Sequence, residues 1–93
     1  MSTSVWKFPV KVTDEAVIEM PEGAHILSVG VQGDQLCVWA HVDPDARLVR
    51  RSILMAGTGH RREDLVWSDF VGTVQMLDGQ FVFHVFDGGE LSE

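Results

Sequence analysis

Residues 70–86, FVGTVQMLDGQFVFHVF, carry the pattern that decides the fold of this chain. Apolar and polar side chains alternate with period two on both sides of Asp78-Gly79, which is typical of half-buried strands joined by a tight turn. Asp-Gly is a strong hairpin signal because both residues tolerate positive φ. The stretch therefore predicts an antiparallel β-hairpin and makes the C-terminal half of the chain β.

The same design appears upstream. Residues 25–43, HILSVGVQGDQLCVWAHVD, have two apolar, β-branched arms around Gly33-Asp34 and predict a second hairpin. Residues 47–57, RLVRRSILMAG, predict a single strand that is entered through the DPDA turn at 43–46. Residues 5–12, VWKFPVKV, alternate cleanly and predict a first strand, and Pro9 places it at a sheet edge.

Two segments leave alternatives open. Residues 13–20, TDEAVIEM, fit a strand or a short helix stopped before Pro21, and we favour the strand because eight residues give little helix stability alone. Residues 61–70, RREDLVWSDF, can carry one helical turn. The tail at 87–93, DGGELSE, is expected to be flexible.

Together these elements predict an all-β fold, a small antiparallel β-sandwich or barrel of about six or seven strands joined by hairpins. The 93 residues form one domain, 1–93. Most of the eight aromatic side chains are expected in the alternating core. Both faces of FVFHVF and of LCVWAHV are apolar, so these strands lie inside a sandwich or at an oligomer interface. We expect a homo-oligomer, most simply a two-fold dimer.

Charge and composition narrow the function. The formal net charge is −7, from 14 acidic and 7 basic residues, which disfavours nucleic-acid binding. The single cysteine, Cys37, excludes an intrachain disulfide and a cysteine metal cluster. No secretory signal and no apolar run of about 20 residues is present, so we expect a cytoplasmic protein without membrane contact.

The basic residues are unevenly placed. Five of the seven lie between positions 47 and 62 with no acid among them: Arg47, Arg50, Arg51, Arg61 and Arg62. Arginine binds phosphate or carboxylate oxygens two at a time, and the GTGH loop at 57–60 offers glycine amides as an anion nest. Trp39 or Trp67 would serve for base stacking. The hypothetical ligand site comprises Arg50, Arg51, Gly57, Thr58, Gly59, His60, Arg61 and Trp39.

A structural interpretation of the same residues stays open. Gly-Thr-Gly also ends strands in ordinary tight turns, and the arginines can pair with Glu63, Asp64 or Asp69. The loop is not a P-loop, because no lysine follows the second glycine and no long helix follows it. A dinucleotide fingerprint is absent as well, so no cofactor is expected.

Neither a metal site nor catalysis is indicated. The four histidines lie on separate segments, although His41 and His84 would approach each other if their strands were neighbours. Cys37 alternates with Trp39 and His41 on one strand face, which is more typical of a buried thiol than of a nucleophile. No catalytic residue and no metal ligand is assigned, and a non-enzyme is favoured.

The chain resembles a family of short, functionally uncharacterised phage and prophage proteins. The matching pieces are VWKFPVKVTDEAVIEMPEGAHILSVGVQ, LCVWAHVDP, GTGH, FVGTVQM and FVFHVF, which cover most of residues 6–86. The resemblance implies no activity and no site residue. It does imply strand, turn and strand for IEMPEGAHILSV, and a host cell cytoplasm as the setting.

The first functional hypothesis is thus a small non-catalytic protein that binds a host or phage protein. The second is an oligomer that sequesters an anionic, nucleotide-like small molecule at the arginine-rich GTGH region. An enzyme ranks third.

Overall fold

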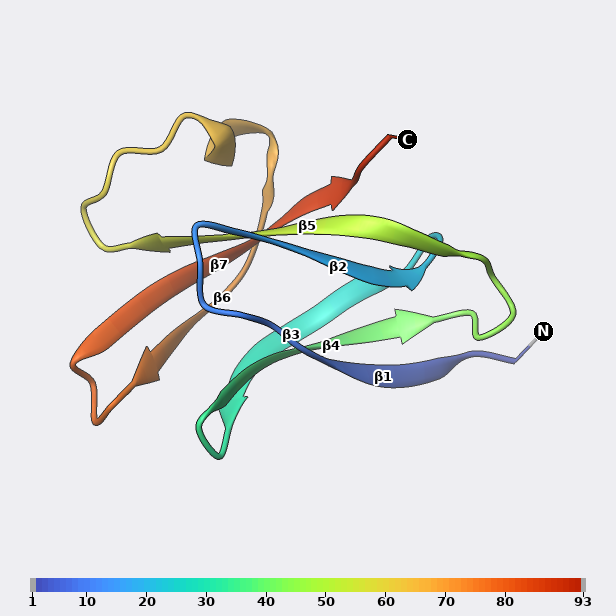
Figure 1. Cartoon of the computed structure of the whole chain (residues 1–93), viewed down its shortest axis with the longest axis horizontal. Coiled ribbons are helices and arrows are strands. Elements are labelled where there is room, and N and C mark those ends of the chain that lie inside the picture. Colours follow the sequence, from blue (N-terminus) through green and yellow to red (C-terminus); the bar gives the residue numbers. More distant parts are fainter. Residues whose placement is uncertain (1, 93) are drawn as a thin grey trace.

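The computed structural model describes residues 2–92 and confirms the all-β class. Seven strands and one 3-10 turn follow one another along the chain (Figure 1). They are β1 (Ser4–Pro9), β2 (Glu15–Pro21), β3 (His25–Gln32), β4 (Gln35–Val42), β5 (Leu48–Gly57), η1 (Asp64–Trp67), β6 (Asp69–Met76) and β7 (Phe81–Glu90). The favoured strand in residues 13–20 and the helical turn in residues 61–70 are both present.

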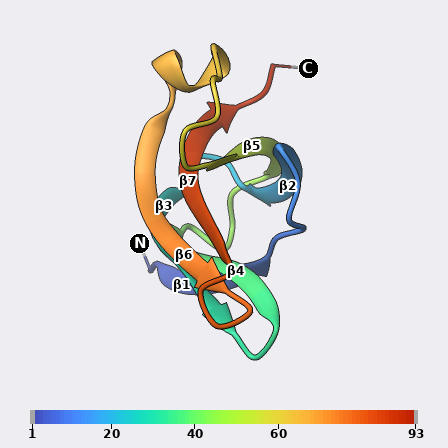
Figure 2. The ribbon, with the colours of Figure 1, turned by 90° about the vertical axis from the view of Figure 1, so that its left-hand side faces the viewer.

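The strands form two antiparallel sheets that face each other as a sandwich (Figures 1 and 2). One sheet has the order β1-β4-β3 and the other has the order β2-β5-β7-β6. The strand–turn–strand segment IEMPEGAHILSV links the two sheets, since β2 and β3 lie in different ones. Gly23, with φ of 79°, turns the chain between them.

Both predicted hairpins are confirmed. Gly33 has φ of 63° in the turn between β3 and β4. The turn between β6 and β7 has three consecutive residues with positive φ, Leu77, Asp78 and Gly79. The predicted 43–46 turn is closed by the Ala46 N–H, which donates to the Asp43 carbonyl at 3.1 Å.

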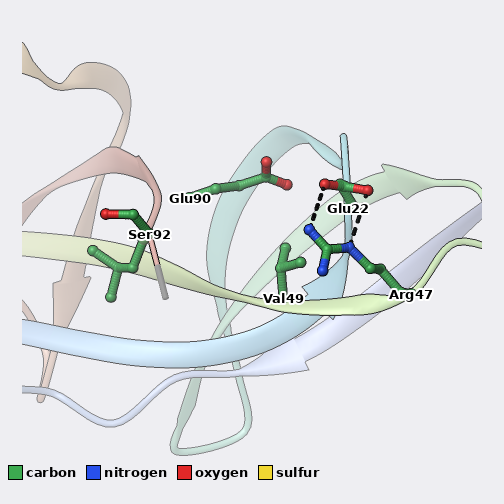
Figure 3. Close-up of a pocket in the computed structure, with 6 residues that line it drawn as sticks. Glu22, Arg47, Val49, Glu90 and Ser92 are labelled. Carbon is green, nitrogen blue, oxygen red and sulfur yellow. Dashed lines mark hydrogen bonds and ion pairs between the residues drawn. The ribbon is translucent and has the colours of Figure 1, made fainter.

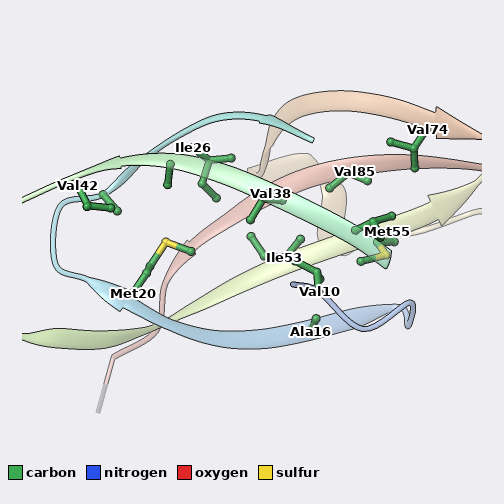
Figure 4. Close-up of a cluster of buried hydrophobic side chains, with 13 residues drawn as sticks. Val10, Ala16, Met20, Ile26, Val38, Val42, Ile53, Met55, Val74 and Val85 are labelled. Atoms are coloured by element: carbon green, nitrogen blue, oxygen red, sulfur yellow. The ribbon is translucent and has the colours of Figure 1, made fainter. Parts of the chain in front are cut away.

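The core lies between the inner faces of the two sheets (Figure 4). Alternate residues of the central strands supply it, including Leu36 and Val38 of β4, Ile53 of β5 and Val85 of β7, none of which is exposed. The sandwich therefore explains one apolar face of FVFHVF and of LCVWAHV. On the outer face of β7, Phe86 packs edge-on against Phe70, with ring centroids 5.5 Å apart.

The two lateral sides of the sandwich differ. On one side β3 packs against β6, and a Cβ on Gly72 would stand 2.9 Å from Val29 Cγ1. On the other side β1 and β2 are the edge strands of their sheets. Pro9 ends β1 and Pro21 ends β2. The predicted edge position of the first strand is thus confirmed, although the strand stops at Pro9 rather than at Val12.

Two further expectations need correction. Residues 87–90 belong to β7 rather than to a flexible tail, because Asp87 and Glu90 lie against Arg51 of β5; Glu93 lies outside the described residues. Several aromatic side chains are also outside the core: Trp67 is 91% exposed, Phe70 61% and Phe81 49%.

Candidate functional site

Arg51, in the middle of the predicted cationic segment, is buried and paired with acids. Its Nε donates to Asp87 Oδ1 at 2.9 Å and its Nη2 to Asp87 Oδ2 at 2.7 Å. Nη1 donates to the Ala24 carbonyl at 2.9 Å and lies 3.8 Å from Glu90 Oε2. The bidentate face of the guanidinium is therefore occupied by Asp87, and the side chain fastens the end of β7 to β5 and to the turn before β3.

The charge state of Asp87 follows from this pairing. Burial raises the pKa of its carboxyl, but hydrogen bonds from Arg51 and from the Gly89 amide, together with the arginine charge, outweigh burial. The pKa of Asp87 is thus below its ordinary value. The pair is ionised at neutral pH and structural in position.

Arg62 is also held by hydrogen bonds to backbone carbonyls and by an ion pair. Its Nη1 donates to the Met55 carbonyl at 2.6 Å, and its Nη2 donates to the Asp14 carbonyl at 3.1 Å. Nε and Nη2 also donate to the two carboxylate oxygens of Asp64, and these bonds lower the pKa of Asp64. Arg62 therefore ties the loop after β5 to the start of β2.

Arg47 borders a surface pocket of about 300 Å³ (Figure 3). Its guanidinium donates to both carboxylate oxygens of Glu22, at 3.3 and 3.1 Å. Glu90 lines the same pocket and accepts a hydrogen bond from the Gly23 amide. Two carboxylates and one guanidinium give this pocket a negative balance, which suits a basic group better than a phosphate.

Arg50 and Arg61 are exposed and lie apart. Arg50 stands on the outer face of β5, opposite Glu19 of β2 in the register. Arg61 lies in the loop between β5 and η1. The five arginines, which cluster in the sequence, are thus spread over the inner and outer faces of β5 and the loops before and after it.

The GTGH segment forms a tight turn. The His60 N–H donates to the Gly57 carbonyl at 3.2 Å, and Gly59 has φ of 86°, a conformation that favours glycine. The His60 ring covers Gly57, where a Cβ would stand 2.9 Å from Cε1. The His60 N–H is therefore already used within the turn, so it is not available to bind an anion.

Thr58 is held by a histidine rather than left open. Thr58 Oγ1 lies 2.7 Å from His84 Nε2, and Thr73 Oγ1 lies 2.9 Å from His84 Nδ1. Each ring nitrogen of His84 thus has one threonine hydroxyl as its partner, and the tautomer of the ring decides which hydroxyl donates. This Thr58–His84–Thr73 network joins the turn to β7 and β6.

The structure brings together only part of the hypothetical ligand site. Gly57, Thr58, Gly59 and His60 are contiguous, but Arg51 lies six positions before Gly57 along an extended strand, a distance of about 20 Å. Trp39 lies on β4 in the other sheet. Its ring packs over Gly30, where an added Cβ would stand 3.4 Å from Trp39 Cζ3. The pocket that Gly57 and His60 line measures about 170 Å³, and its other lining residues are Val12, Thr13, Asp14, Met55 and Phe83.

His41 and Cys37 have ordinary structural partners. The condition under which His41 and His84 would approach each other is not met, because β4 and β7 are not neighbouring strands of one sheet. His41 Nε2 lies 2.8 Å from Thr3 Oγ1. Cys37 is buried, with Sγ 3.6 Å from the Gln35 carbonyl. Within residues 2–92, no group of three or more His, Cys, Asp or Glu side chains is arranged to hold a metal ion.

Three strongly exposed apolar side chains lie near the 3-10 turn, where the sequence pattern did not predict a surface. Val66 is 72% exposed and Trp67 91%, both in η1, and Phe70 follows at the start of β6 with 61%. We call these three residues the Trp67 patch. The exposure of this surface could have been inferred from Ser68 and Asp69, two polar residues that interrupt the apolar alternation between Trp67 and Phe70.

A second apolar surface lies at the tip of the β6–β7 hairpin. A pocket of about 330 Å³ is lined by Val12, Met76, Leu77, Phe81 and Phe83. The rings of Phe81 and Phe83 are stacked there, 6.2 Å apart and nearly parallel.

In residues 2–92, no helix is long and apolar enough to cross a membrane.

Comparisons with known proteins place the chain in a family. No match to the chain was found among curated proteins or among solved structures. One family model spans the whole of it, residues 1–93. The chain therefore belongs to DUF7352, described as a domain of unknown function.

Proposed function

We propose that this protein is a small non-catalytic binding protein, encoded by a phage or prophage, that acts on a host or phage protein in the host cytoplasm. The observation that carries the proposal is the Trp67 patch. A monomer gains no stability from a tryptophan that is 91% exposed. Tryptophan is also one of the residue types enriched among the side chains that dominate binding energy at protein interfaces.

The charged residues around the patch suggest the chemistry of the partner. Glu63 and Asp64 precede Val66, and Asp69 stands between Trp67 and Phe70. Asp64 is neutralised by Arg62, whereas the whole chain carries a net charge of −7. The matching surface is an apolar pocket with a basic rim, because such a rim steers the encounter and fixes orientation.

The anionic-ligand hypothesis ranks second on this geometry. Arg51 and Arg62 already pair with Asp87 and Asp64, and Trp39 lies on the opposite sheet from the GTGH turn. A nucleotide-like ligand would have to bind at Arg61 and the turn alone. A thermal-shift screen of nucleotides tests it, since a ligand at ~100 times its dissociation constant stabilises a fold by about 2.7 kcal/mol.

The test of the proposed function places a photo-crosslinking amino acid at position 67 in cells that carry the gene. We expect a covalent adduct with one protein, identified by mass spectrometry. Binding of that purified protein is then measured by calorimetry with the wild type and with Trp67→Ala. Loss of a buried tryptophan anchor weakens binding by at least about thirtyfold, the equivalent of ~2 kcal/mol.

The matched control is Val5→Ala, a change at an apolar side chain that is 55% exposed on the other sheet. This variant is expected to bind like the wild type. Equal affinity of Trp67→Ala and wild type for the crosslinked protein overturns the assignment of the patch. Turnover of a small molecule by the purified protein overturns the non-catalytic role.

The homo-oligomer remains part of the proposal. The apolar pocket at the β6–β7 hairpin tip is the candidate contact between copies, because Leu77 is 64% exposed and Phe81 49%. Native mass spectrometry reports the subunit number, and Leu77→Ser with Phe81→Ser is expected to give the monomer.

A further inference from the structure

The free edge of β2 presents three backbone positions that its sheet leaves unused. The Met55 N–H donates to the Asp14 carbonyl, and the Glu22 N–H donates to the Arg47 carbonyl. In an antiparallel ladder every second residue bonds to the neighbouring strand, so the even-numbered residues of β2 point their peptide groups toward β5. The N–H and C=O groups of Glu15, Val17 and Glu19 therefore point away from the sheet.

These groups are open to solvent. Glu15, Val17 and Glu19 are all exposed, and Val17 keeps 48% of its surface. No turn, loop or side-chain hydrogen bond within residues 2–92 uses their peptide groups. Their side chains share the outer face of the sheet, where an apolar residue stands between two carboxylates. An unpaired edge of this kind is a template for another strand.

We infer that the β2 edge binds an extended segment of another protein, which adds a fifth strand to the four-stranded sheet. The segment carries Lys or Arg at two positions four residues apart and a β-branched residue midway, so that its side chains oppose Glu15, Val17 and Glu19. Backbone hydrogen bonds supply affinity, and the cross-strand charge pairs supply specificity. The inference is independent of the Trp67 patch.

A second copy of β2 does not fit this edge. Two-fold antiparallel pairing about Val17 would set Glu15 of one copy directly opposite Glu19 of the other, and like charges in that position are destabilising. The β3 and β6 edges are taken by their mutual packing. The β1 edge presents only two outward N–H groups, those of Val5 and Lys7, since Val10 and Leu36 form a bonded pair and Pro9 has no N–H.

The experiment titrates the full chain, labelled with ¹⁵N, with a blocked heptapeptide of sequence Thr-Lys-Thr-Val-Thr-Lys-Thr. We expect amide shifts centred on Glu15, Val17 and Glu19, and hydrogen exchange at the Val17 and Glu19 amides slowed by about tenfold at saturation. A peptide with Glu in place of both lysines is expected to leave the spectrum unchanged.

Two proline variants isolate the backbone contribution. Val17→Pro removes one outward N–H of β2 and leaves the β2–β5 ladder intact, while Val5→Pro makes the same change on β1. We expect the first to abolish the peptide shifts and the second to preserve them. Glu19→Gln, which leaves the backbone unchanged, is expected to weaken binding several-fold.

Three results of the peptide titration overturn the inference. They are shifts centred on β1 or on the Trp67 patch, equal binding of the lysine and glutamate peptides, and no shifts at the solubility limit of the lysine peptide. Concentration-dependent shifts at the β2 edge without peptide show instead that the edge pairs with a second copy, and they overturn it as well.

Discussion

Gly72 of β6 lies directly against Val29 of β3, so that a Cβ on Gly72 would come within 2.9 Å of Val29 Cγ1. This contact closes one lateral side of the sandwich. We expect Gly72→Ala to lower the free energy of unfolding by about 1–3 kcal/mol, because the added methyl group overpacks a tight contact. Urea denaturation at pH 7 measures the change.

The matched test of this contact is the double variant Gly72→Ala with Val29→Ala. Removing the valine methyl groups makes room for the new Cβ, so the cost of the alanine at position 72 is expected to fall. A cost that is the same in both backgrounds would show that the strain lies in the β6 backbone instead.

Arg51→Met keeps the aliphatic stem of the side chain but leaves Asp87 without its cation. The side chains are 11% and 14% exposed. We expect a loss of about 3 kcal/mol, the lower end for a broken buried pair, since both groups keep some contact with water. Chemical denaturation measures the loss, and Arg51→Met with Asp87→Asn gives the coupling energy. A loss below about 1 kcal/mol contradicts the role assigned to the pair.

The stability of the protein is expected to fall in acid through Asp87. Its folded-state pKa is lowered, so its contribution is present above the unfolded value of about 3.9 and is lost as pH falls through the folded-state pKa. The free energy of unfolding of the wild type should therefore fall toward that of Asp87→Asn as the pH is lowered from about 4 to the folded-state pKa of Asp87. Unfolding free energies at several pH values test this, with Asp34→Asn in an exposed turn as the control.

Trp67→Ala is expected to change the unfolding free energy by no more than about 0.5 kcal/mol, because the side chain makes few contacts within the molecule. Thermal unfolding followed by circular dichroism measures it. A marked fall in Tm would mean that Trp67 supports the fold and would remove the basis for a binding patch.

Thr58→Val keeps the shape of the side chain and removes the hydroxyl that meets His84. We expect a loss of about 0.5–1.5 kcal/mol and faster amide exchange in the 57–60 turn. Thr13→Val, a change at an exposed threonine, serves as the control. Unchanged exchange in the turn would show that His84 does not hold it.

The sequence was sufficient to predict strands and turns because their signals are local. Alternation across Phe81, Phe83 and Val85 reports one buried face, and Asp78-Gly79 reports the turn before it. The partition into two sheets was not readable in this way. The short turn at Gly23 links strands of different sheets, and only the packing of the sheets decides that.

The candidate site was less predictable because ion pairs connect residues far apart in the chain. Arg51 meets Asp87, 36 positions away, in a segment that composition alone describes as a flexible glycine-rich tail. Adjacent arginines also point to opposite faces of β5, so Arg50 and Arg51 never shared a surface. Exposure of Trp67 depends on how the 3-10 turn sits on the sheet, which no periodicity reports.

The prolines that end β1 and β2 also limit how far a strand of another molecule can extend along these two edges. Both occupy outward positions of a free edge, so each removes an N–H that only another molecule would need. A strand from another molecule that pairs with β1 cannot continue its ladder through Pro9, and one that pairs with β2 cannot continue through Pro21. The two prolines therefore act against unlimited edge-to-edge pairing, which is the usual hazard of an open sheet edge.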